Sequence, residues 1–386
     1  MDFEWAWLLL GLPIAFILGW LASRLDWRQM RILQRSAPRA YFQGLTYLLN
    51  EQQDQAIDVF VQAVQSDPDT VELHFALGSL FRRRGEYDRA VRVHEHLLAR
   101  ADLSAVDRAR AQWELAQDFL KAGLLDRAEN ALRPLEGTTL ESQAQTALLY
   151  IYERTHDWEQ ALRLTARMTN EHERAQLAGK QMHYLCEQAN EAMRQQAFDR
   201  AAALLAQAKA VDAAGVRPGI EQVKLLLAQG QHRQAVEWAL QVSEKMPQTL
   251  PLLAGMWDGT IFDALQDDQL LLQQVHTALR VHYETEASLD VLLALVAIER
   301  HMGLPRAGAW YVEHIRRHPS LVAAANWMEL QQQDPVIERA LDKAMQPLLN
   351  YRCLHCGFEA RNYFWQCPGC QSWESFPTKR VEELHT

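Results

Sequence analysis

Cysteine is scarce in this 386-residue chain, and the five that occur are unevenly placed. Four lie close together near the C-terminus, and one, Cys186, stands alone. A secreted protein held by disulfides spreads its cysteines over the fold, so this distribution indicates metal binding in a reducing compartment. Positive charge is not in excess either: the net charge is −10, which argues against a nucleic-acid partner.

Signatures of catalysis are lacking as well. The sequence holds no GxGxxG, GxxxxGK[ST], HExxH or GxSxG pattern. His183 precedes Cys186 by one helical turn, but no orienting acid or oxyanion site accompanies the pair. A buried structural thiol is therefore the preferred interpretation of Cys186. We predict no catalytic residues, no organic cofactor and no enzyme activity.

Charge is absent from residues 5–22, WAWLLLGLPIAFILGWLA. As a helix rising 1.5 Å per residue, this stretch spans about 27 Å, close to the hydrocarbon thickness of a bilayer. Asp2 and Glu4 stand where a cleaved signal peptide would carry basic residues, which favours an uncleaved anchor. Residues 1–22 are thus predicted to form an N-terminal transmembrane helix.

A basic juxtamembrane segment, residues 23–39, follows the span. Its arginines are Arg24, Arg28, Arg31, Arg35 and Arg39. By the positive-inside rule this side is cytoplasmic, so the short N-terminus faces out and the bulk of the chain faces in. The arginines either lie against anionic lipid headgroups of the membrane or only fix the topology, and both interpretations stay open.

Residues 40–347 lack strand-like alternation and instead carry a repeat of 34 residues. The first unit places small, aromatic and proline residues at Gly44, Tyr47, Ala56, Phe60, Ala63 and Pro68. Corresponding positions 34 residues later are Gly78, Phe81, Ala90, His94 and Leu97. Small residues let paired helices approach closely while aromatic ones fill the gap to the next pair, so the pattern predicts a tetratricopeptide-repeat superhelix.

A third unit repeats the pattern with Ala116, Phe119 and Ala128, and the parts after it match less well. There, second helices are marked by Ala161, Ala201 and Ala235, residues 250–283 are degenerate, and residues 292–319 recover part of the pattern. His94 occupies a core position, which favours a packed histidine over a ligand. Arg82–Arg84 close one first helix and are interpreted as a solvated helix end, with an acidic partner as the alternative.

The four clustered cysteines form two CxxC pairs ten residues apart, within RCLHCGFEARNYFWQCPGCQSWESFP. Cys353, Cys356, Cys367 and Cys370 are predicted to hold one metal ion, zinc or a single iron, in a closed tetrahedral shell. A module of about 30 residues has too small a core to fold alone, so metal binding supplies its folding energy. Residues 348–386 are assigned to this module and its tail, with aromatic side chains left to dock it on the array.

Together, the N-terminal span, the repeat array and the terminal CLHCGF…CPGCQSW module resemble the lipopolysaccharide assembly protein B (LapB, formerly YciM) family of Gram-negative bacteria. The resemblance covers nearly the whole chain. It implies an all-α repeat protein of the bacterial inner membrane, with a periplasmic N-terminus and a rubredoxin-like C-terminal module, and it favours iron. The ten-residue separation is shorter than in true rubredoxins and closer to a zinc ribbon.

The resemblance also implies partners and a function. Proteins of this family promote proteolysis of the deacetylase LpxC by the membrane protease FtsH, which limits lipid A synthesis, and YejM (LapC) opposes them. The alternatives are a scaffold that gathers lipopolysaccharide enzymes and a rubredoxin-type electron carrier. A homodimer of the array is left open.

Overall fold

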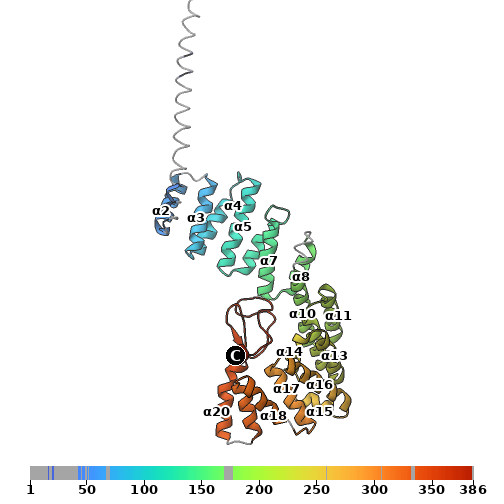
Figure 1. Cartoon of the computed structure of the whole chain (residues 1–386). Coiled ribbons are helices and arrows are strands. Elements are labelled where there is room, and N and C mark those ends of the chain that lie inside the picture. Colours follow the sequence, from blue (N-terminus) through green and yellow to red (C-terminus); the bar gives the residue numbers. More distant parts are fainter. Residues whose placement is uncertain are drawn as a thin grey trace, which may run out of the picture. The chain divides into compact units, whose positions relative to one another are not determined.

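The computed structural model describes residues 52–66, 70–168, 177–257, 259–305, 307–331 and 335–384, together with positions 16, 20, 42–44, 46, 47 and 50 (Figure 1). The predicted span at residues 5–22 lies outside the described residues except for Phe16 and Trp20, and so does the basic segment 23–39. Of the helices that are described, none combines the length and the apolar character needed to cross a bilayer.

The chain divides into two compact units, residues 1–151 and 152–386. The helices of the first unit are α2 (Gln53–Ser66), α3 (Val71–Arg83), α4 (Tyr87–Leu98), α5 (Ala105–Lys121), α6 (Leu125–Leu132), the 3-10 turn η1 (Arg133–Leu135) and α7 (Glu141–Thr155), whose last residues belong to the second unit. From α2 to α6, consecutive helices pack against one another as the repeat predicts.

Close approach of paired helices explains why the repeat has glycine at its small positions, Gly44 and Gly78. A Cβ atom on Gly44 would lie 2.6 Å from the Phe60 ring, and one on Gly78 would lie 2.4 Å from the His94 imidazole. Both contacts are shorter than carbon atoms tolerate, so only glycine lets these helices pack. His94 is buried, as predicted, and its Nδ1 lies 2.6 Å from Asp118 Oδ2.

The interpretation of Arg82–Arg84 as a solvated helix end is wrong for Arg82. Its side chain is only 18% exposed and donates to Asp118 Oδ1 at 2.7 Å and to Glu114. The same Asp118 also contacts His94, so one buried carboxylate joins α3, α4 and α5. A carboxylate without solvent must be paired, which accounts for the arginine at this place.

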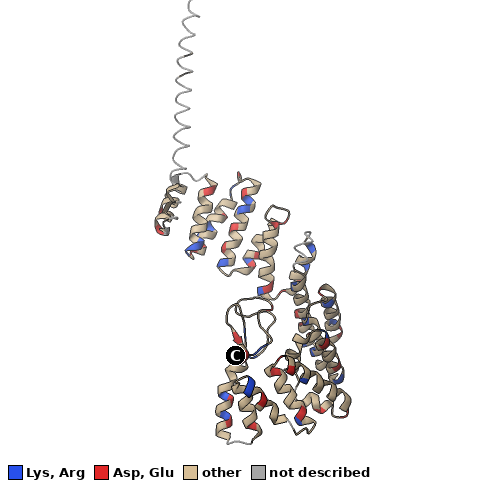
Figure 2. Ribbon diagram, viewed as in Figure 1, with Lys and Arg blue, Asp and Glu red and all other residues tan. Residues whose placement is uncertain are grey.

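The second unit continues the helix pairs. Its array comprises α8 (Trp158–Arg167), α10 (Ala178–Arg194), α11 (Phe198–Val211), α12 (Arg217–Ala228), α13 (His232–Lys245), η2 (Pro247–Thr249), α14 (Leu250–Ala254), α15 (Gly259–Ala264), α16 (Gln269–Thr285), α17 (Leu289–His301), α18 (Ala307–Arg317), α19 (Leu321–Leu330) and α20 (Pro335–Met345). The predicted second-helix alanines Ala161, Ala201 and Ala235 are all buried, and the predicted all-α repeat architecture is confirmed. Figure 2 shows both signs of charge interspersed along the helices.

The C-terminal module follows η3 (Gln346–Leu349) and contains a two-stranded antiparallel sheet of β1 (Tyr351–Arg352) and β2 (Glu359–Ala360). Among the described residues these are the only strands. The chain then closes with η4 (Val381–Leu384), near the point marked C in Figure 1.

Acidic residues of η4 cap two helices that lie far away in sequence. Glu382 accepts hydrogen bonds from Ser320 Oγ at 2.6 Å and from the backbone N–H of Val322, at the start of α19. Glu383 accepts from the backbone N–H of Leu289, at the start of α17, at 3.0 Å. Carboxylates satisfy the unpaired N–H groups and the dipole at helix N-termini. The tail therefore fastens the end of the module to the array.

Glu383 should make stability depend on pH. Burial raises its pKa from 4.5 to about 7, so the folded protein binds this proton more tightly than the unfolded chain does. Its contribution to stability therefore declines as the pH rises from about 4.5 to about 7. Glu383→Gln cannot ionise, so its Tm should fall less than that of the parent protein as the pH rises from 4.5 to 8.

Thermal unfolding across this pH range measures the effect. Glu284→Gln is the matched control, because Glu284 is exposed and pairs only with Arg280 on its own helix among the described residues. Parallel Tm–pH curves for Glu383→Gln and the parent protein would contradict the assignment.

Candidate metal centre

Two tight turns carry the four cysteines. In the first, Gly357 adopts φ +77° and its backbone N–H donates to the Cys353 carbonyl at 2.9 Å. In the second, Gln371 adopts φ +62° and its N–H donates to the Cys367 carbonyl at 2.8 Å. Each turn is thus closed by a left-handed residue directly after its second cysteine. Glycine suits this backbone conformation at position 357, whereas Gln371 is unexpected because left-handed backbone favours glycine.

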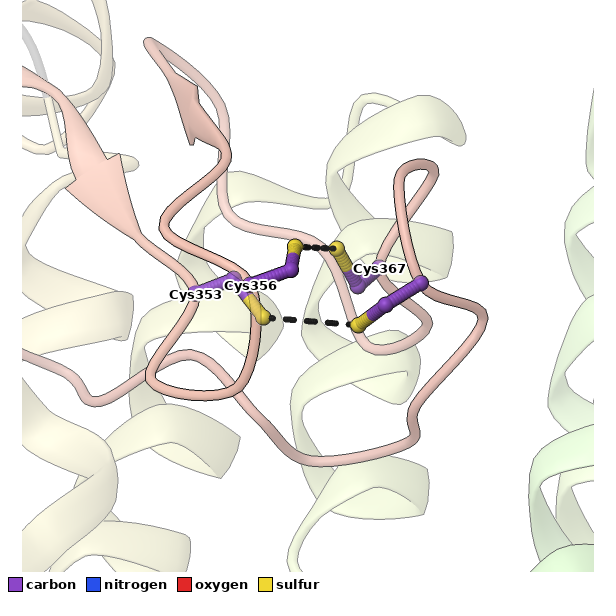
Figure 3. Close-up of side chains that lie close together, drawn as sticks. Cys353, Cys356 and Cys367 are labelled. Atoms are coloured by element: carbon purple, nitrogen blue, oxygen red, sulfur yellow. Dashed lines mark hydrogen bonds between the residues drawn. The ribbon is translucent and has the colours of Figure 1, made fainter. Parts of the chain in front are cut away.

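The turns face each other and bring all four predicted ligands together (Figure 3). Sγ of Cys353 lies 3.7 Å from Sγ of Cys370, Sγ of Cys356 lies 3.6 Å from Sγ of Cys367, and all four sulfurs lie within 4.8 Å of one another. Four sulfurs bound tetrahedrally at about 2.3 Å would be separated by about 3.8 Å. The distances fit a bound ion and are far longer than a disulfide bond of about 2.05 Å.

The surroundings of the cage differ between its sulfurs. At Cys353, burial opposes ionisation, but the hydrogen bond shared with Ser375 and those from backbone N–H groups outweigh it and lower the thiol pKa to about 6. At Cys367, burial predominates and raises the pKa to about 12. Only the thiolate binds a metal, so loading the site must displace protons from sulfurs such as that of Cys367.

The cage offers one ion four cysteine ligands. Four thiolates complete a tetrahedral shell and leave no position for water activation, which indicates one structural metal ion. His355 lies between two ligands but is exposed, and its Nδ1 lies 2.9 Å from Ser372 Oγ rather than at the sulfurs. Cys186 lies on α10, is 0% exposed and is not part of the cage; burial raises its pKa to about 12, as expected of an unreactive thiol.

Next to the cage, Trp373 packs the module against α10. Its indole stacks on the His183 ring with centroids 4.6 Å apart and an interplanar angle of 16°. Its Nε1 donates to Glu153 at 3.3 Å, and Tyr184 and Trp158 meet its ring edge to face. An aromatic surface is thus buried and its polar atom is satisfied.

Arg217, at the start of α12, lies beneath this contact. It is 1% exposed, and its guanidinium donates to Glu187 at 2.6 Å and to Glu221 at 3.3 Å. The same group lies 5.4 Å from the Trp365 ring centroid and 5.9 Å from that of Trp373. A buried cation needs such carboxylates, and a desolvated guanidinium is attracted to aromatic faces.

His183 extends this network to the module. Arg217 donates to His183 Nδ1 at 3.2 Å, and His183 Nε2 lies 3.2 Å from Glu374 Oε1. A hydrogen bond from His183 holds the pKa of Glu374 below its ordinary value. His183, noted from the sequence only for its spacing to Cys186, therefore serves the docking surface. Arg217 was missed, because one arginine at a helix start carries no signal for a contact about 150 residues away.

Removing one thiolate should release the ion. We expect the Cys356→Ser protein to purify with less than one tenth of the metal content of the parent, since three thiolates bind far more weakly than four. Cys186→Ala is the control and should keep one ion per chain, which elemental mass spectrometry measures. Full metal content in Cys356→Ser would show that the cage is not the binding site.

Removing the Trp373 indole should detach the module from α10 without releasing its metal ion. Trp373→Ala should lower the free energy of unfolding by about 3 kcal/mol, near the low end for a Trp→Ala change because Trp373 is only half-buried. Proteolytic cleavage around residue 346 should become faster while the metal content stays unchanged. Phe358→Ala, an exposed aromatic on the same module, is the control and should have little effect. Equal cleavage rates in both variants would count against the docking surface.

Comparisons with known proteins agree with this architecture. Residues 351–377 match the family model of the rubredoxin metal binding domain, and residues 73–106 match that of the tetratricopeptide repeat. Among solved structures, a chain of Naa15/Naa10 bound to HypK-THB has a TM-score of 0.39 and 16% identity, over 78% of this chain and 52% of that chain. A TM-score this low adds nothing to the assignment.

Two relatives match from end to end. Lipopolysaccharide assembly protein B of Haemophilus influenzae (strain Rd) is 27% identical over 95% of this chain and 96% of its own length. Lipopolysaccharide assembly protein B of Escherichia coli K12 is 31% identical over 98% of this chain and 99% of its own length. With the repeat array and the four-cysteine module both in place, the chain belongs to the lipopolysaccharide assembly protein B family.

Proposed function

We propose that this chain is a non-enzymatic adaptor in lipopolysaccharide assembly. The observation that carries the proposal is the 31% identity with a lipopolysaccharide assembly protein over 98% of the chain. Helix-pair arrays provide extended surfaces for holding segments of other proteins. The four-thiolate site is closed, so it supports a structural role more than a reaction.

The finer mechanism extends the family resemblance. In this proposal residues 1–22 anchor the chain in the inner membrane with a periplasmic N-terminus, and the array presents LpxC to FtsH in the cytoplasm. YejM (LapC) opposes this step. Anchoring an adaptor in the same membrane as the protease raises their effective concentration, so weak contacts suffice for transfer of the client.

The ion is proposed to be structural, with iron favoured by the rubredoxin-like module and zinc as the alternative. The fully thiolate donor set suits both metals. Its part in the function is to keep the docking surface of Trp365 and Trp373 in place. An iron-filled site that cycles reversibly in a redox titration and whose reduction controls activity would favour an electron carrier instead.

The half-life of LpxC in cells tests the adaptor function. Depleting the chain should lengthen it several-fold, because the client no longer reaches the protease. Complementation with Cys186→Ala should restore the short half-life, whereas Cys356→Ser, expressed at the same level, should not. An unchanged half-life on depletion would contradict the adaptor proposal and favour a scaffold of biosynthetic enzymes.

A further inference from the structure

A polar cleft lies where the end of the array meets the chain around the metal module. It has a volume of about 430 Å³, within the range of small-molecule sites. One wall comes from α17, α18 and α19, and the other from Leu349, Arg361 and Arg380, which flank or belong to the module. The cleft is separate from the thiolate cage, and none of the four cysteines lines it.

The floor of the cleft is buried and offers unused donors. Trp257 is 5% exposed, and its indole N–H has no hydrogen-bond partner in the described part of the chain. Burial raises the pKa of Tyr311 to about 12, so its phenol remains protonated and able to donate. The buried Asp290 is neutralised by Arg380, whose guanidinium reaches both carboxylate oxygens at 2.8 and 2.9 Å.

The rim carries two further arginines. Arg300 is exposed on α17 and forms no ion pair within the residues that the structure describes. Arg361 donates one hydrogen bond, to Gln346 Oε1 at 3.0 Å, and no carboxylate pairs with it in the described ranges. The cleft is lined by two acidic residues, Asp290 and Glu329. Asp290 pairs with Arg380, whereas Glu329 has no basic partner among the described residues. Counting Arg300, Arg361 and Glu329, the unpaired charge of the cleft is therefore positive.

We propose that this cleft binds the phosphate group of a small phosphate monoester. Two guanidinium groups on opposite walls, an indole N–H and a phenol offer more donors than the two oxygens of a carboxylate need, whereas a phosphate has three terminal oxygens. Arginine is the side chain best suited to such oxygens. The volume exceeds that of phosphate alone, so the site accommodates an organic group as well.

Binding in the cleft should depend on the module, because the module and its tail supply the second wall. Arg361 belongs to the module, and Arg380 lies in the tail that Glu382 and Glu383 fasten to the array. The cleft is complete only when the module is docked. A ligand that binds only the complete site therefore stabilises the docked form by mass action.

Titration calorimetry of the full-length, metal-loaded protein with glycerol 3-phosphate tests the site. Saturable binding with one site per chain is expected. Arg300→Ala and Arg361→Ala should each weaken it by about tenfold or more, since each removes a charged hydrogen-bond donor. Arg316→Ala is the matched control: it removes the same charge from an exposed position outside the cleft and should change the affinity less than twofold.

Glu329→Gln provides a change in the opposite direction. Removing the unneutralised carboxylate should tighten phosphate binding several-fold, a gain that a damaged fold cannot produce. Absence of saturable binding, equal affinity for succinate, or equal losses in Arg300→Ala and Arg316→Ala would each overturn the proposal.

Competition with vesicles containing phosphatidic acid identifies the source of the phosphate group. Displacement of glycerol 3-phosphate by the vesicles assigns the site to a lipid phosphate, and absence of displacement assigns it to a free monoester. LpxC turnover does not enter this test, so its outcome is independent of the adaptor function.

Discussion

The contact between Trp373 and His183, with Arg217 beneath it, is the interaction on which the second unit depends. It joins a metal-folded module to α10 and α12, and the contacting residues of these helices lie more than 140 positions before the two tryptophans in the chain. Arg217 is almost fully buried, so its charge needs both Glu187 and Glu221 and the faces of the two tryptophans. Docking thus buries aromatic surface while keeping a desolvated cation satisfied.

The ion contributes to this contact from a distance. Trp365 and Trp373 flank the second CxxC turn, so their positions follow from the turn that Cys367 and Cys370 close around the metal. A module this small has little core of its own. Loss of the ion would therefore free the tryptophans and expose Arg217. In this account the cage acts through the shape of the docking surface, which agrees with its closed coordination shell.

Features with local signals could be predicted from the sequence. The spacing of Cys353, Cys356, Cys367 and Cys370 predicted their convergence, because tight turns are set by neighbouring residues. Gly78 and Ala201 predicted close helix packing, because small residues at repeat spacing have few other causes. The membrane span and the partners remain predictions that the described residues do not test.

Features that depend on long-range contacts could not be predicted. Arg82 looked like a solvated helix end because its partner Asp118 stands 36 residues away. Capping of α17 and α19 by the terminal VEEL segment pairs residues 60 to 94 positions apart, with no periodic pattern to indicate it. The same holds for the cleft between Arg300 and Arg361, whose walls meet only after the module has docked.

Hydrogen exchange tests whether the metal maintains the docked module and thereby orders α10 and α12. Mass spectrometry would compare backbone amide exchange in Ala178–Arg194 and Arg217–Ala228 before and after the ion is stripped with a thiol-compatible chelator. We expect faster exchange in both helices on metal removal and unchanged exchange in α3 and α4 of the first unit. Unchanged exchange in α10 and α12 after complete metal loss would contradict this expectation.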